Sequence, residues 1–156
     1  MIEQYMALAL QPTMRGCRTR ADVTTNIRHI SELIDAAVWL SAIDLPVRLI
    51  CIPEGCLQGF TDEVFDWDHE KYVDELALDL PGEETDALGR KAKQHNAFVI
   101  AQAKVKHPEF PKKFFRVGTA WRPQFSEDRP TQARAPAPIG RRSDVQTRSD
   151  GPEGRG

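Results

Sequence analysis

The chain has 156 residues, 40% of them hydrophobic, which is enough apolar material for one domain with its own core. Its 21 basic and 23 acidic residues give a net charge of -2, so composition provides no general attraction to nucleic acid or to an anionic membrane. Three cysteines are too few and too irregularly spaced for a disulfide framework or a usual zinc site. We therefore predict a cytoplasmic protein that uses no metal or cofactor and binds neither nucleic acid nor membrane.

The start of the chain predicts a strand rather than a signal peptide. Glu3 stands where a signal peptide carries positive charge, and the apolar run at residues 6–10 is too short for one. Pro12 closes this run, which suits a buried strand. No later stretch approaches the roughly 18 to 20 apolar residues that span a bilayer.

A long helix and a second strand are predicted next. Asp22 is suited to cap a helix whose apolar residues recur at steps of three and four, so that one face packs inward. Residues 45–52 are almost continuously apolar and predict a central strand. Pro53 ends this strand because proline has no N–H to donate, which leaves Glu54 at its carboxyl end.

The pattern then repeats after a polar stretch. Residues 83–96 suit a helix with acidic residues in its first turn, and residues 97–105 suit a third strand. On that strand we expect Lys104 and Lys106 to face solvent or the polar side of the sheet. The order strand, helix, strand, helix, strand predicts an α/β layered fold in which helices cover a sheet.

The composition changes near the end of this region. After Lys113 every basic residue is arginine, and prolines and glycines interrupt any apolar periodicity. Residues 1–113 carry 13 basic and 18 acidic residues, whereas residues 114–156 carry 8 and 5. We therefore predict a domain at residues 4–118 and a disordered or unrelated tail at 119–156. A shifted reading frame, a different exon or a fusion would explain such a tail, and a natural disordered tail is the alternative.

The segment at residues 45–60, centred on Pro53 and Glu54, resembles the strand and loop that present the catalytic glutamate in the nitrilase superfamily of carbon-nitrogen hydrolases. Two further stretches occur in the order of this family: residues 7–12 with the helix containing Asn26, and residues 81–89 with the strand at 98–103. The resemblance covers about residues 4–118. It implies the N-terminal part of an α-β-β-α sandwich, from an enzyme that commonly forms homo-oligomers.

The resemblance also implies a role for Glu54 as general base in a Glu-Lys-Cys mechanism. The glutamate takes a proton from a cysteine thiol, the thiolate attacks a nitrile or amide carbon, and a lysine stabilises the tetrahedral intermediate. The position itself is suitable, because ligands of open α/β sheets gather at the carboxyl ends of strands. Without the resemblance, a glutamate after a strand is more often a solvated loop residue.

The lysine and the cysteine of the family pattern are not found in this sequence. No cysteine follows Cys56, and every lysine after Glu54 lies within or before the third strand and the turn after it. We therefore expect a truncated chain that is inactive alone. Cys56 shares a face with Glu54 in an extended segment and could replace the nucleophile, but a partly buried loop residue is the favoured interpretation, and Cys51 is expected in the core.

Other functional classes have weaker support. A non-enzymatic α/β interaction module, whose basic tail contacts an acidic partner or RNA, is the alternative to a hydrolase. The sequence contains neither of the usual glycine-rich nucleotide-binding motifs. The four histidines lack metal-ligand spacing, and the acidic cluster at residues 62–70 lacks the glycine of a calcium loop and is expected to be a solvated loop.

Overall fold

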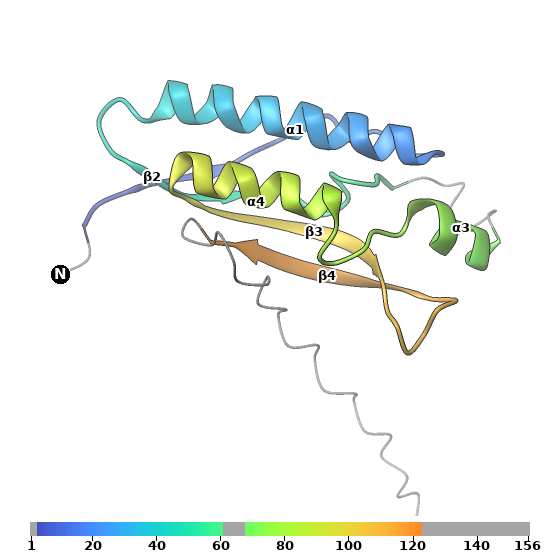
Figure 1. Ribbon diagram of the computed structural model, residues 1–156. Coiled ribbons are helices and arrows are strands. Elements are labelled where there is room, and N and C mark those ends of the chain that lie inside the picture. The colour runs from blue at the N-terminus through green and yellow to red at the C-terminus, as the bar shows by residue number, and fades with distance from the viewer. Residues whose placement is uncertain (1–2, 61–67, 123–156) are drawn as a thin grey trace, which may run out of the picture.

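The computed structural model describes residues 3–60 and 68–122. Its sheet has the strand order β1-β2-β3-β4, in which the first three strands are parallel and β4 is antiparallel to β3. Helices α1 and α4 lie over one face of this sheet, and α3 lies near the carboxyl end of β3 (Figure 1). The predicted α/β fold is thus confirmed. The elements are β1 (Met6–Ala9), α1 (Arg20–Ser41), β2 (Val47–Cys51), α3 (His69–Leu76), α4 (Glu83–His95), β3 (Phe98–Lys106) and β4 (Phe114–Trp121).

Helix α1 begins earlier than predicted, because its cap is Thr19 and not Asp22. The Asp22 backbone N–H donates to Thr19 Oγ1 at 3.3 Å, and the Thr19 N–H donates to Asp22 Oδ2 at 2.8 Å. This reciprocal pair is a capping box, which satisfies two N–H groups at the start of the helix. Asp22 therefore contributes to the helix start from the third position of the helix rather than from the cap.

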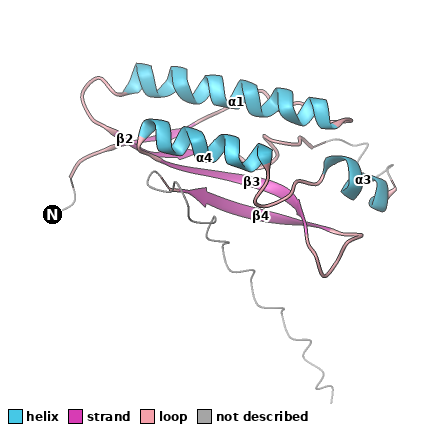
Figure 2. Ribbon diagram, in the orientation of Figure 1, coloured by secondary structure: helices cyan, strands magenta, loops and turns pink. Residues whose placement is uncertain are grey.

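The sheet is covered by helices on one face. Along β3, Val99, Ala101, Ala103 and Val105 are buried in the cluster that also contains the apolar side chains of α1 and α4. Their neighbours on the strand point to the other face, where Phe98 and Ile100 are exposed. Figure 2 shows both long helices on the same side of the sheet. The described residues thus form one sheet with one helix layer.

The last strand was not predicted. β4 (Phe114–Trp121) crosses the expected domain boundary at residue 118 and pairs with β3 along its whole length. Its last residue, Trp121, is buried, and a Cβ atom at Gly89 of α4 would lie 3.2 Å from the Trp121 ring. The antiparallel pairing places this part of the arginine-rich region in the domain. The rest of the predicted tail, residues 123–156, lies outside the described residues.

Part of the expected acidic loop is helical. Asp68 caps α3 by accepting a hydrogen bond from the Lys71 N–H at 3.0 Å, and Glu70 lies in the first turn, where the helix dipole favours negative charge. Residues 61–67 lie outside the described residues. None of the described helices is both long and apolar enough to cross a membrane.

Asp35 joins α1 to α4. Its carboxylate lies 2.6 Å from Lys91 Nζ and 2.6 Å from His95 Nε2, and it accepts a third bond from Gln94 at 3.3 Å. Burial alone would raise the pKa of Asp35, but the hydrogen bonds from Lys91 and His95 outweigh burial and hold it below its usual range. The folded state therefore prefers the charged carboxylate.

We predict that Asp35→Asn lowers the free energy of unfolding by about 0.5–1 kcal/mol near pH 6, a value discounted because Asp35 is partly exposed. A carboxyl whose folded pKa is lowered stabilises above its unfolded pKa, and this contribution is lost as pH falls through the folded value. The difference between wild type and variant should therefore shrink below about pH 4. Urea unfolding across this range measures it, with exposed Asp44→Asn as control. A difference that is independent of pH would contradict this account.

Candidate functional site

Glu54 follows β2 in the turn at residues 54–58. Its side chain is 51% exposed, and its Oε1 atom lies 3.3 Å from Arg116 Nη1 on β4. The five residues after it, 55–59, are all buried. The carboxylate thus stands at the carboxyl end of a parallel strand, in reach of solvent, on a turn whose backbone is enclosed by the protein.

Two glycines shape this turn. Gly55 has a φ of 79° and Gly59 a φ of 75°, in the left-handed region that residues other than glycine rarely adopt. The Gly59 N–H donates to the Gly55 carbonyl at 2.6 Å. A Cβ atom at Gly59 would lie 2.5 Å from the backbone oxygen of Arg15. At Gly55 it would meet the ring of Phe60, which is an exposed side chain. Gly59 is therefore the less replaceable of the two.

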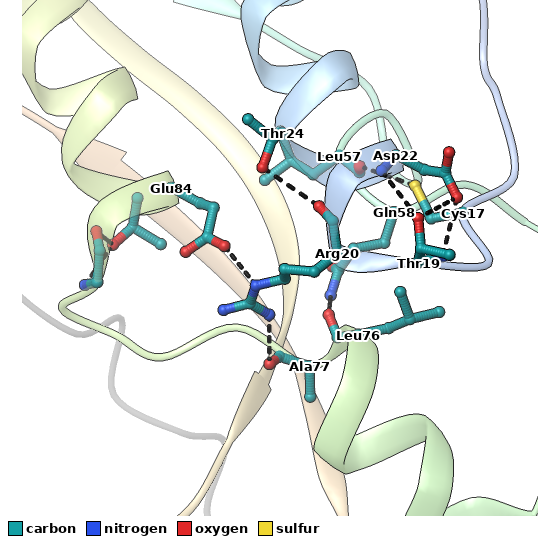
Figure 3. A network of polar contacts seen from close by, with 12 residues as sticks. Cys17, Thr19, Arg20, Asp22, Thr24, Leu57, Gln58, Leu76, Ala77 and Glu84 are labelled. Atoms are coloured by element: carbon teal, nitrogen blue, oxygen red, sulfur yellow. Dashed lines mark hydrogen bonds and ion pairs between the residues drawn. The ribbon is translucent and has the colours of Figure 1, made fainter.

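A buried amide, Gln58, joins the turn to β3 and α3. Its Oε1 accepts from the Lys104 N–H at 2.7 Å, and its Nε2 donates to the Lys104 carbonyl at 2.9 Å and to the Leu76 carbonyl at 2.7 Å. Figure 3 shows the Gln58 side chain reaching the end of α3 at Leu76. The side chain pairs with β3 as a strand backbone would, so that all its polar atoms are satisfied while it is only 3% exposed. This role was not predicted, because nothing in the sequence distinguishes it from a surface glutamine.

A second buried amide, Asn26 of α1, holds the turn from the other side. Its Nδ2 atom donates to the carbonyl groups of Arg15 at 3.0 Å and Leu57 at 3.1 Å, and lies 3.2 Å from Cys17 Sγ. Cys17 and Leu57 lie side by side at the start of α1 (Figure 3). The loop before α1 and the turn after β2 are thus attached to the same helix.

Arg20 forms an ion pair and a hydrogen bond near the end of α3. Arg20 Nε lies 2.5 Å from Glu84 Oε1 of α4, and Arg20 Nη1 donates to the Ala77 carbonyl at 3.0 Å (Figure 3). One guanidinium therefore links α1, α4 and the residue that ends α3. This contact and the Gln58 amide hold adjacent carbonyl groups, those of Ala77 and Leu76.

Lys104 is buried, contrary to the prediction that it faces solvent or the polar side of the sheet. It is 3% exposed, and its Nζ atom donates to the Gly59 carbonyl at 3.1 Å. The rings of Phe60, Tyr72 and Phe114 surround this atom at 5.9, 5.3 and 6.0 Å from their centroids. Burial lowers the pKa of Lys104, and the charge of Arg116 lowers it further. The alternation along β3 places Lys104 on the face without helices, and aromatic side chains cover it there.

The cysteines near the turn are not activated. Cys56 was predicted to be partly buried and is fully buried, and burial raises the pKa of its thiol to about 12. Burial and then the charge of Asp22 raise the pKa of Cys17 to about 11. Cys51 is half-buried within β2. No three His, Cys, Asp or Glu side chains in the described ranges are grouped so as to hold a metal ion.

We predict that Gly59→Ala lowers the free energy of unfolding by about 2–4 kcal/mol, because a left-handed backbone and a clash with the Arg15 carbonyl act together. Gly118→Ala is the matched control, because a Cβ atom there meets nothing within 4 Å. It should be neutral or slightly stabilising. Urea unfolding of both variants measures the difference, and equal stabilities would contradict a backbone constraint at Gly59.

We predict that Cys51→Ser leaves two thiols, Cys17 and Cys56, that react with an aromatic disulfide reagent at pH 8 on the order of 100-fold more slowly in the folded than in the unfolded chain. Their raised pKa values leave little thiolate at this pH, and both sulfur atoms are covered. Stopped-flow absorbance measures the rates. A fast phase for one thiol would identify an activated cysteine that the structure does not show.

Comparison with known proteins gives matches among solved structures, whereas no protein-family model and no curated protein matches the sequence. A cysteine-to-serine variant of N-terminal amidase superposes with a TM-score of 0.57 and 16% identity, over 75% of this chain and 25% of that one. N-terminal amidase with a Gln-Gly peptide gives 0.57 and 15% over the same shares. Nit3 of Saccharomyces cerevisiae, a member of branch 10 of the nitrilase superfamily, gives 0.50 and 12%, over 69% and 36%.

These identities are low, so the likeness is one of fold. The chain spans about a quarter of the length of the N-terminal amidase that it matches. The arrangement of strands and helices nevertheless agrees with the expectation from residues 45–60 and the stretches before and after them. The described part of the chain is thus similar in fold to part of N-terminal amidase and to part of Nit3.

Proposed function

We propose that this chain is the glutamate-bearing part of a carbon-nitrogen hydrolase of the nitrilase superfamily, with Glu54 as its general base. The observation that supports the proposal is the placement of Glu54. Its carboxylate is accessible at the carboxyl end of β2, while buried hydrogen bonds from Gln58 and Asn26 hold the turn that carries it. A general base needs such a fixed position, because proton transfer depends on the distance to the acid.

The described residues account for one part of a Glu-Lys-Cys mechanism. Glu54 would accept the thiol proton, and the thiolate would attack the amide carbon to form a tetrahedral intermediate. The nitrogen would take up that proton and leave as ammonia or an amine, and water would then cleave the thioester to give the acid and the free thiol. With a nitrile, water would first add to the thioimidate before ammonia leaves. Cys17 and Cys56 are unsuited to be that nucleophile, because both are buried and their thiols have raised pKa values. We therefore propose that the nucleophile and the lysine of the mechanism are not supplied by the described residues, and that the chain is truncated and inactive alone.

The substrate we propose is a small molecule with an amide bond, with nitriles as the second class. The similar N-terminal amidase structures include complexes with Gln-Gly, Gln-Val and Asn-Glu peptides, which favours amides. The complete enzyme is proposed to be a cytoplasmic homo-oligomer without nucleic-acid or membrane partners. The exposed apolar residues of β3, Phe98 and Ile100, fit a chain whose sheet is covered in a larger assembly.

We predict that Gln-Gly dipeptide at millimolar concentration shifts the backbone amide resonances of residues 54–59, and that Glu54→Gln removes this effect by taking away the carboxylate that contacts the amide. The control is Glu32→Gln on the exposed face of α1, which should behave as wild type. Two-dimensional NMR titration of the full chain measures both. Shifts elsewhere, or equal shifts in the Glu54 variant, would count against Glu54 as the base.

Ammonia release from simple amides and nitriles completes the test, with wild type, Glu54→Gln and Cys56→Ser assayed together. No release from any of them is the expected result. Turnover that is lost in both variants would make Cys56 the nucleophile and would overturn the proposal of an incomplete site. Turnover that is lost only in Glu54→Gln would support the general base but overturn the proposed inactivity.

A further inference from the structure

We infer that Lys104 is a positioning residue for Glu54. Its ammonium group, enclosed by three aromatic rings, holds the turn at residues 54–59 by donating a hydrogen bond to the Gly59 carbonyl. This inference rests on the proposed role of Glu54 and adds a residue to that site. The lysine lies inside strand β3, whereas the lysine expected from the family resemblance lies beyond a further hairpin. It would therefore be an additional group and not the missing one.

Three hydrogen bonds connect Lys104 and its strand to the turn that carries Glu54. Lys104 Nζ donates to the Gly59 carbonyl at 3.1 Å, and the Gly59 N–H donates to the Gly55 carbonyl at 2.6 Å. The Gly55 N–H in turn donates to Gln102 Oε1 at 3.2 Å, which lies two residues before Lys104 on the same face of β3. Gly55 follows Glu54 directly. One strand thus holds both ends of the turn, with Lys104 at one end and Gln102 at the other.

Burying the Lys104 ammonium group costs free energy that an uncharged, space-filling side chain would not cost. An ammonium group removed from water loses its hydration. Among the described residues, Lys104 is 3% exposed and forms none of the ion pairs. Aromatic faces offset part of this loss, and the rings of Phe60, Tyr72 and Phe114 lie close enough to do so. A methionine of similar length would fill the same space without a charge. The charge therefore needs a use, and groups held at such a cost are frequent at functional sites.

The use that we propose is to hold the turn that carries Glu54, and the charge of Glu54 also acts on the lysine. Burial and then the charge of Arg116 lower the pKa of Lys104, and the negative charge of Glu54 acts in the opposite direction. The lysine thus holds the backbone of the turn that carries Glu54, through its hydrogen bond to the Gly59 carbonyl. Gln58 cannot replace it, because the Gln58 amide holds β3 and α3 whereas Lys104 holds the Gly59 carbonyl.

The test uses the full chain with Lys104→Met, Lys104→Arg and the control Lys106→Met, which alters the next lysine on the same face of β3. Amide hydrogen exchange of Gly55 and Gly59 is measured by NMR. We expect Lys104→Met to accelerate exchange at these two amides about tenfold, the effect of losing one hydrogen bond. Exchange in the middle of β3 and the melting temperature should remain near wild type, and Lys104→Arg should restore most of the protection.

A second measurement separates positioning from support of the fold. The titration of the Lys104 ammonium, followed through its side-chain carbon resonance, should move to lower pH in Glu54→Gln and stay in place in Glu32→Gln. An unmoved titration would overturn the coupling. Unchanged exchange at Gly55 and Gly59, or acceleration spread equally over the sheet, would overturn the positioning role. Neither measurement requires turnover or amide binding, so failure of the proposed hydrolase function would be seen separately.

Discussion

The pairing of the Gln58 side chain with the backbone of Lys104 is the interaction on which the site depends. A carboxamide has the donor and acceptor arrangement of a peptide group, so Gln58 can extend the hydrogen bonding of β3 by one position without a further strand. The same side chain also reaches the carbonyl that ends α3. Because it is buried, loss of either partner would leave polar atoms without water or protein contacts, which costs about 1–3 kcal/mol for each group. Loss of this side chain would therefore detach the turn from β3 and from α3 at the same time.

In the described residues, the two faces of the sheet differ in how far they are covered. On the helix face, small and branched residues of β3 pack in one core with the apolar residues of α1 and α4. Trp121 of β4 lies on the same face, next to Gly89 of α4. On the opposite face, Phe98 and Ile100 are exposed at the start of β3, whereas aromatic rings cover Lys104 near its end. Burial of that apolar surface would provide about 25 cal/mol for each Å² removed from water. A second layer on this face would therefore gain stability.

The elements that could be predicted are those whose signal is local. Periodic apolar residues indicated α1, and a continuous apolar run closed by Pro53 indicated β2 and the position of Glu54. The last strand, β4, was missed because arginine and glycine interrupt its pattern, and its structure comes from pairing with β3. The burial of Lys104 was missed for a related reason. It depends on Phe60, Tyr72 and Phe114, which are far apart in the sequence and meet only in the fold.

Glu54 and the residues of its turn differ in how firmly they are held, which fits the role that we propose for Glu54. Buried amides, left-handed glycines and an enclosed ammonium group fix the turn, whereas the carboxylate forms an exposed ion pair with Arg116. Exposed ion pairs contribute little to stability, so Glu54 is free to change partners while the backbone that carries it stays in place. A catalytic base needs this combination, because its position must be fixed and its charge must remain available to the substrate.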